Sequence, residues 1–219
     1  MARIAIIGSN DLGLLIAHHA TTANWEVAGF FDNRKEVNTP IDIYGKILGS
    51  VEDVEGLFNK KVFDYLFVGV GYTQFSYRKE VFERFKGRIP FANLIHKSAY
   101  VDSSVILGEG NFVLPGCVLD AGVCLDDNVL LNTGCTIAHH TRIKSHSFLA
   151  PGVTIAGKVV VDECCFLGVG CVIQDNVHIS PRVLIGGGAV VVSNISEAGT
   201  YMGVPAKRTK DNIFFNISS

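Results

Sequence analysis

Residues 129–152 read VLLNTG, CTIAHH, TRIKSH and SFLAPG when they are divided into consecutive blocks of six. The same division runs without insertion from Ala99 to Asn194, giving sixteen hexads. The third position is Leu, Ile or Val in every hexad, and the first is small or β-branched in nearly all, Asn111 being the exception. Glycine, Asp and Asn are concentrated at positions four to six, where turns are expected.

This period of six predicts a parallel β-helix. Side chains alternate between the two faces of a strand, so positions one and three of each hexad both point inward. Three hexads form one triangular coil of about 18 residues, and successive coils stack about 4.8 Å apart. Because one coil cannot bury its inner face alone, several coils must stack to form a core.

Residues 1–95 follow a different pattern, in which short apolar runs alternate with helix-like segments. The expected strands are 4–7, 27–31, 64–68 and 91–95, and the expected helices are 14–22, a segment opened by a capping box at 50–53, and 75–86. This order predicts a small Rossmann-like βαβαβ domain with a parallel sheet. We therefore expect a mainly β protein with an α/β N-terminal domain at 1–95 and a β-helix domain with a C-terminal tail at 96–219.

The composition is typical of soluble globular proteins, with 18% charged and 48% apolar residues. A net charge of −2 argues against nucleic-acid binding. We expect no membrane insertion, because no apolar run reaches about 18 residues, and no signal peptide, because the N-terminus runs straight into a strand. Four of the six cysteines occupy the inward first position, so we interpret them as buried apolar residues of a reduced, cytoplasmic protein.

The carboxyl ends of the expected N-terminal strands carry the first candidate site. Ligands of open α/β sheets bind there, where helix N-termini offer N–H groups to phosphate. A glycine turn, GSNDLG, is expected at residues 8–13, and Asp32 lies about 20 residues beyond it, where a ribose-binding acid is expected. The turn has the spacing G-x-x-x-x-G rather than the dinucleotide fingerprint, so we favour a mononucleotide or nucleotide-sugar phosphate. A purely structural turn is the alternative.

The pair His139-His140, at positions five and six of one hexad, is the second candidate site. Two imidazoles at an outer corner do not fill a core, and a solvated turn is the alternative. Histidine titrates near neutral pH and can act as a general base. Gly157 should stack above His139 one coil later with an open N–H, which would add an oxyanion donor for acyl transfer. His146 could belong to this site, whereas zinc binding is disfavoured because no ligand spacing is present.

The hexads, the segment LNTGCTIAHH at 131–140 and the exit YMGVPAKR at 201–208 resemble the left-handed β-helix acyltransferases. With the glycine-turn domain before the hexads, the chain is similar more narrowly to the nucleotide-amino-sugar N-acetyltransferases that are grouped with sialic acid O-acetyltransferases. The resemblance implies a left-handed β-helix, a homotrimer, and acetyl-CoA bound in the cleft between adjacent β-helices.

The resemblance also implies roles for single residues. It makes His139 the catalytic base and places the thioester oxygen near Gly157. The implied coenzyme contacts are Phe148, Gly157, Val169 and Gly187, with Lys207 and Arg208 near the phosphates. The implied contacts of the substrate nucleotide are Gly8, Ser9, Asn10, Asp11, Leu12, Asp32, Asn33 and Gly71.

Two positions depart from the family pattern. A carboxylate often follows the catalytic histidine, but here that position is His140. Either Asp120 or Asp126, within one chain or across the trimer, orients the base, or the base works unaided. A histidine that contacts the coenzyme in some relatives aligns with Phe148. This change would replace a polar contact with an apolar wall against pantetheine.

We therefore expect a metal-independent acetyl-CoA-dependent sugar N-acetyltransferase of surface-polysaccharide or glycan precursor biosynthesis. Its acceptor would be the amine of a UDP- or dTDP-linked 4-amino-4,6-dideoxysugar. O-acetylation of a sugar hydroxyl, such as that of sialic acid, stays open because it would use the same base. A metal-dependent hydratase and a non-catalytic nucleotide-sugar binder are further alternatives. A dehydrogenase is disfavoured because the dinucleotide fingerprint is absent.

Overall fold

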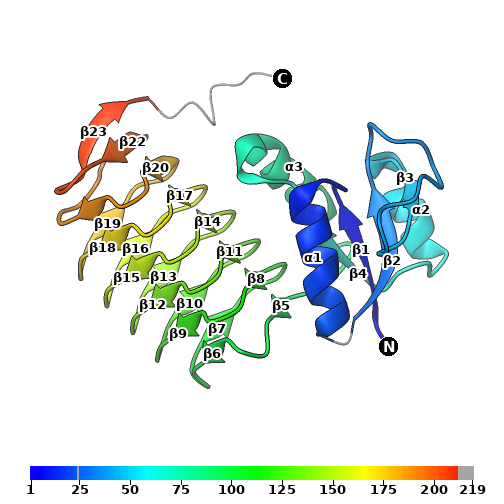
Figure 1. The fold of residues 1–219 in the computed structure, drawn as a ribbon, viewed down its shortest axis with the longest axis horizontal. Coiled ribbons are helices and arrows are strands. Elements are labelled where there is room, and N and C mark those ends of the chain that lie inside the picture. Colours follow the sequence, from blue (N-terminus) through cyan, green and yellow to red (C-terminus); the bar gives the residue numbers. More distant parts are fainter. Residues whose placement is uncertain (24, 212–219) are drawn as a thin grey trace. The chain divides into compact units, whose positions relative to one another are not determined.

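The structure, a computed structural model, describes residues 1–23 and 25–211 (Figure 1). The chain divides between Leu94 and Ile95 into two units, each with its own buried hydrophobic cluster. No helix of the described residues is long and apolar enough to cross a membrane.

A parallel four-stranded sheet forms the centre of the N-terminal unit. Its strand order is β3-β2-β1-β4, and all neighbouring strands run parallel. The strands are β1 (Arg3–Ile7), β2 (Glu26–Phe31), β3 (Ile47–Gly49) and β4 (Tyr65–Val68), and the helices are α1 (Asp11–Thr22), η1 (Val51–Asp53), α2 (Val54–Asn59), η2 (Tyr72–Gln74) and α3 (Phe75–Phe85). The predicted α/β class is confirmed, and the capping box that opens η1 is present.

Two elements of this sheet differ from the sequence prediction. The expected strand at 91–95 is wrong, because Phe91 makes only an isolated bridge to Leu66 and β5 (Leu94–Ile95) pairs with the β-helix instead. Strand β3 was not predicted. It has only three residues, and a register shift interrupts its pairing with β2, so it leaves little periodic signal.

The β-helix has one short strand per hexad (Figure 1). Strands of successive coils pair in parallel, which gives the β-helix three faces. Partners lie 18 residues apart, as in the pairing of Leu130 with Phe148. The first face contains β6 (Tyr100–Val101), β9 (Val118–Leu119), β12 (Thr136–Ile137), β15 (Thr154–Ile155), β18 (Val172–Ile173) and β21 (Val190–Val191). The second face contains β7 (Ile106–Leu107), β10 (Cys124–Leu125), β13 (Arg142–Ile143), β16 (Val160–Val161) and β19 (His178–Ile179). The third face contains β5, β8 (Phe112–Val113), β11 (Leu130–Leu131), β14 (Phe148–Leu149), β17 (Phe166–Leu167), β20 (Val183–Ile185) and the closing hairpin of β22 (Gly199–Met202) and β23 (Lys207–Lys210).

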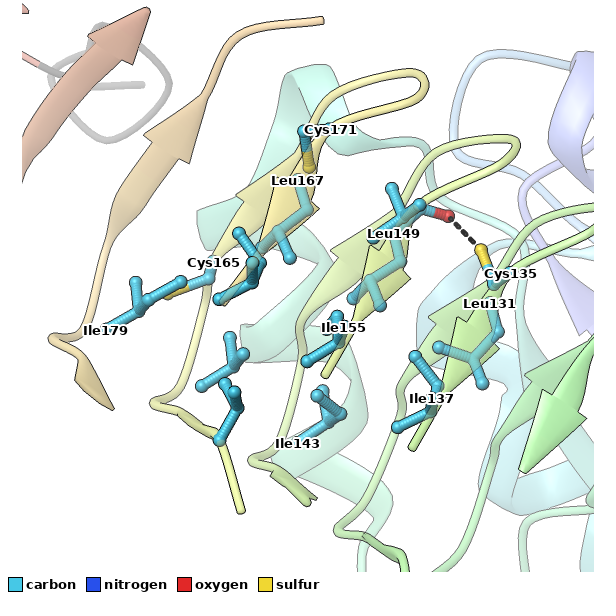
Figure 2. Close-up of a cluster of buried hydrophobic side chains, with 14 of the residues drawn as sticks. Leu131, Cys135, Ile137, Ile143, Leu149, Ile155, Cys165, Leu167, Cys171 and Ile179 are labelled. Atoms are coloured by element: carbon cyan, nitrogen blue, oxygen red, sulfur yellow. Dashed lines mark hydrogen bonds between the residues drawn. The ribbon is translucent and has the colours of Figure 1, made fainter. Parts of the chain in front are cut away.

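Positions one and three of the hexads form the core of the β-helix, as predicted. Figure 2 shows these side chains converging between the faces, with the Cys135 thiol directed at the Leu149 carbonyl. All six cysteines are free thiols. Burial raises the pKa of the Cys165 and Cys171 thiols to about 12, so both stay protonated in the interior.

The corners of the coil share one backbone conformation. Position six has a positive φ in every hexad from Gly110 to Gly188, whether or not glycine occupies it. His140, with a φ of 59°, is one of the non-glycine residues in this series. The hexad pattern thus sets the conformation of the candidate site.

Candidate functional site

His139 and His140 lie at the corner between the first and second faces, directly after β12. Both side chains are exposed. The coils above and below hold the turn through its backbone, because the Lys158 N–H donates to the His139 carbonyl and the His140 N–H donates to the Ala121 carbonyl, each at 2.9 Å. The two imidazoles are therefore mounted on a backbone that is fixed from both sides.

The imidazole of His139 lies against Gly157, as the 18-residue spacing predicts. A Cβ atom built on Gly157 would lie 2.6 Å from Nε2 and 2.7 Å from Cε1 of His139. Only glycine leaves room for the ring in this position. Within residues 1–23 and 25–211, the Gly157 N–H donates no hydrogen bond. A nitrogen base and an open backbone donor thus share one corner of the coil.

The second imidazole contacts the first, which the sequence did not reveal. Nδ1 of His139 lies 3.1 Å from Nδ1 of His140, with the ring planes at 80°. The His140 ring in turn covers Gly122 one coil below, where a Cβ would lie 3.1 Å from its Cδ2. Each imidazole therefore occupies space that is left by a glycine of a neighbouring coil.

Neither carboxylate considered from the sequence orients His139 within the chain. Oδ1 of Asp120 accepts the Ala121 N–H at 2.8 Å, and Oδ1 of Asp126 accepts Nη2 of Arg142 at 2.9 Å on the second face. The hydrogen-bonding partner that the described chain offers to His139 is His140.

His146 does not join this site, which corrects the sequence interpretation. It lies at a different corner, between the second and third faces, and is only 1% exposed. Its Nδ1 is 3.1 Å from Nδ2 of Asn128 one coil below. Its place at position six did not distinguish an inward from an outward side chain.

Apart from Gly157, the residues implied as coenzyme contacts lie away from His139. Val169 is 60% exposed at the corner between the third and first faces. Gly187 stacks above it, and a Cβ there would lie 3.3 Å from the Val169 carbonyl oxygen. Phe148 lies on the third face, stacked on Phe166 with ring centroids 5.7 Å apart. Within one chain, His139 and Gly157 therefore occupy one corner of the coil, and Val169 and Gly187 occupy another.

Lys207 and Arg208 lie side by side on β23 but differ in their surroundings. The Arg208 guanidinium donates to Oδ1 of Asp211 at 2.6 Å and to the Ala198 carbonyl at 3.3 Å. A phosphate would have to displace these acceptors. The Lys207 side chain is exposed and makes no hydrogen bond to the described residues, so it is the more available cation.

The glycine turn of the N-terminal unit lies at the carboxyl ends of β1, β2 and β4, as predicted. Gly8 has a φ of 99°, and a Cβ there would lie 2.9 Å from the Gly69 carbonyl oxygen. A Cβ on Gly13 would lie 2.1 Å from the Gly8 carbonyl oxygen. These glycines are required for close packing of α1 on the sheet, whereas a Cβ on Gly71 would meet nothing within 4 Å.

Asp32 is tied to this turn. Its Oδ2 accepts the Ser9 hydroxyl at 2.6 Å, and its Oδ1 accepts the Arg34 N–H at 2.9 Å. Burial by itself raises the pKa of Asp32, but the hydrogen bonds from Ser9 and Arg34 and the charge of Lys35 outweigh it and hold that pKa below its ordinary value. Asp32 is therefore an ionised acceptor at neutral pH.

The remaining nucleotide candidates surround the same edge. Asn33 uses its side-chain oxygen to accept the Val51 N–H at 2.8 Å, which leaves its amide nitrogen to donate. The N–H groups of Asp11 and Leu12 in the first turn of α1 donate to no acceptor in the described residues, and Asn10 makes no side-chain cap. Lys35, which was not among the residues predicted from the sequence, donates from Nζ to the Ser9 carbonyl at 3.4 Å.

Comparison with known proteins shows the class of this architecture. No protein-family model and no curated protein sequence matches the chain. Among solved structures, the acetyltransferase domain of PglB from Neisseria gonorrhoeae FA1090 is similar, with 26% identity, a TM-score of 0.85 and coverage of 95% of this chain and 100% of that one. A histidine-to-alanine variant of GDP-perosamine N-acetyltransferase from Caulobacter crescentus, in complex with CoA and GDP-perosamine, has 27% identity, a TM-score of 0.88 and coverage of 96% and 98%.

WeeI from Acinetobacter baumannii AYE shares the fold, with 19% identity, a TM-score of 0.80 and coverage of 95% of this chain and 100% of that one. The resemblance to the hexapeptide-repeat left-handed β-helix acetyltransferases is thus confirmed. The described residues contain no group of three or more His, Cys, Asp or Glu side chains placed to hold a metal ion.

Proposed function

We propose that this chain transfers the acetyl group of acetyl-CoA to the amine of a nucleotide-linked 4-amino-4,6-dideoxysugar, in the synthesis of a surface polysaccharide or glycan precursor. The observation that carries the proposal is the stacking of His139 on Gly157, which joins a base to an open N–H. The solved N-acetyltransferases of similar fold, one of them bound to CoA and GDP-perosamine, support the reaction class. The free buried cysteines suit a reducing, cytoplasmic compartment.

We assign one step of the reaction to each group. The amine attacks the thioester carbon in its neutral form, after the ammonium group has lost one proton to water, and His139 removes the second proton that the nitrogen loses as the C–N bond forms. As the C–N bond forms, the Gly157 N–H stabilises the developing oxyanion, a contribution of about 3 kcal/mol in comparable sites. The C–S bond then breaks, and the proton held by His139 passes to the CoA sulfur. No side chain is acylated in this scheme, which agrees with the burial of four of the six cysteine thiols in the core.

We assign nucleotide binding to the glycine-turn edge of the N-terminal unit. The open N–H groups at the start of α1 and the Lys35 ammonium group suit a phosphate. The ionised Asp32 suits a ribose hydroxyl, which can donate to its carboxylate. Three identities of the nucleotide are considered. UDP and dTDP are expected from the sequence, and GDP is the nucleotide that the perosamine enzyme binds.

A panel of acceptors tests the function. With acetyl-CoA as donor, CoA release should require a UDP-, dTDP- or GDP-linked 4-amino-4,6-dideoxysugar, and mass spectrometry should locate the acetyl group on nitrogen. The matched 4-hydroxy sugar nucleotide and the amino sugar without a nucleotide serve as controls. If the 4-hydroxy sugar nucleotide is the preferred acceptor, the protein is an O-acetyltransferase. Tight nucleotide binding without CoA release would indicate a non-catalytic binder.

We further propose that acetyl-CoA lies between two copies of the chain in a homotrimer, where the corner of one copy that carries His139 faces the corner of its neighbour that carries Val169. The separation of these two groups within one chain supports this arrangement. Each active site would then need both copies.

Complementation between two inactive variants tests the shared site. His139→Ala and Val169→Trp should each abolish transfer, since the first lacks the base and the second fills the coenzyme contact. Co-expression with different tags should restore activity to roughly a quarter of the wild-type level, because a quarter of random neighbours pair intact residues. A mixture of His139→Ala with the double variant His139→Ala/Val169→Trp should stay inactive. Absence of recovery in the first mixture, or an active Val169→Trp variant, would contradict the shared site.

A further inference from the structure

The contact between the two imidazoles of the corner admits only two proton arrangements. A neutral imidazole has one nitrogen that donates and one that accepts, and the two Nδ1 atoms lie 3.1 Å apart. In the first arrangement, His139 donates from Nδ1 and its Nε2 is left as an acceptor. In the second, His140 donates, and the proton of His139 lies on Nε2.

Only the first arrangement gives a base that faces Gly157. Nε2 is the atom of His139 nearest to the position of a Gly157 Cβ, at 2.6 Å. We propose that His140 is a positioning residue, which accepts the Nδ1–H of His139 and thereby holds an unprotonated Nε2 against Gly157. This inference rests on the proposed role of His139 as the base, and it gives His140 the task that a carboxylate would otherwise perform.

The surroundings hold His140 in place for this task. Its backbone has a φ of 59°, its N–H donates to Ala121, and its ring covers Gly122, so two coils define where its Nδ1 lies. The bond also stabilises the imidazolium that His139 becomes during turnover, because the neutral His140 continues to accept its Nδ1–H. His140 thus acts through His139 and needs no contact with either substrate.

The charged groups nearest to the pair have other partners or lie on other coils. Lys158 and Asp175 occupy the same corner one and two coils above, and Asp175 accepts a bond from Asn176. Asp120, one coil below Ala138, accepts a bond from Ala121, and Arg142 of the next strand pairs with Asp126. Within the described chain, none of these five groups hydrogen-bonds to either imidazole.

Three variants of His140 test the role. Asn and Asp place an oxygen near the position of Nδ1 and tolerate a positive φ, whereas Leu has a similar branched shape without an acceptor. His140→Leu should lower kcat about 10- to 100-fold, by analogy with partners that orient metal-binding imidazoles, with the KM of both substrates nearly unchanged. His140→Asn should recover most of kcat. His140→Asp should also do so and should move the acid limb of the pH profile of kcat/KM to higher pH, because a carboxylate favours the imidazolium.

A second measurement does not depend on activity or on the folding of the Leu variant. In the wild-type protein, 15N chemical shifts of the histidine rings near pH 8 should assign the proton of His139 to Nδ1 and that of His140 to Nε2. A proton on Nε2 of His139, or a His140→Leu variant with wild-type kcat, would overturn the proposal. If no acceptor is acetylated by the wild-type protein, the proposed function fails, but the ring tautomers still decide whether His140 accepts from His139.

Discussion

Replacement of His139 with Ala should lower kcat by about 10²- to 10⁴-fold, the range that general-base catalysis supplies. The attacking nitrogen must lose a proton as the C–N bond forms, and without His139 no imidazole lies against Gly157 to accept it. The side chain is exposed and rests on Gly157 and His140, so its loss should change the free energy of unfolding by no more than about 0.5 kcal/mol. Steady-state kinetics with the preferred acceptor, together with thermal unfolding, measures both effects.

A matched histidine provides the control. His178 is an outward-facing residue of β19 on the second face, and its Nε2 lies 2.8 Å from Oδ2 of Asp162. His178→Ala removes an exposed imidazole from the same β-helix without touching the corner, so its kcat should equal that of the wild type. A His139→Ala variant with near-normal turnover would refute the assignment of the base.

The substitution Gly157→Ala should reduce kcat by about 100-fold or more while preserving the backbone donor. The new methyl group would lie 2.6 Å from Nε2 of His139, closer than any stable contact, so the ring must move away. A displacement of about 1 Å at a reacting group can cost a factor of 10². Because the ring is exposed and free to rotate outward, the fold should persist, as circular dichroism can verify.

Two comparisons isolate the cause of this loss. Gly56→Ala, on α2, adds a methyl group that meets nothing within 4 Å and should leave activity unchanged. The double variant His139→Ala/Gly157→Ala should be no worse than His139→Ala alone, because the methyl group acts by displacing a ring that is already absent. Additive losses in this cycle would mean that Gly157 serves catalysis without acting on His139.

The fold could be predicted from the sequence because the hexad repeats the same physical requirement in every coil. An aliphatic third position and a small first position define the core, and the 18-residue register then places Gly157 on His139. That register depends on backbone geometry alone, so the stacking followed from counting residues.

Details that depend on side-chain rotamers could not be predicted by counting residues. The contact of His139 with His140 requires a positive φ and a bare Gly122 beneath the second ring. Arg208 was expected near a phosphate, but Asp211, three residues further on, supplies it with an acceptor. In the N-terminal unit, β3 is set by its pairing with β2 rather than by a pattern of its own.

The stacking of the coils also determines the order in which the β-helix unfolds. Each coil contacts only the coils directly above and below it, so stability is a sum over neighbours and opening starts where a neighbour is missing. The coils with β12 and β15 have stacked strands on both sides, while β23 ends the third face as an antiparallel edge. Fraying at the terminal coils therefore leaves the corner with His139 and Gly157 assembled, and the two residues separate only when the middle of the stack unfolds.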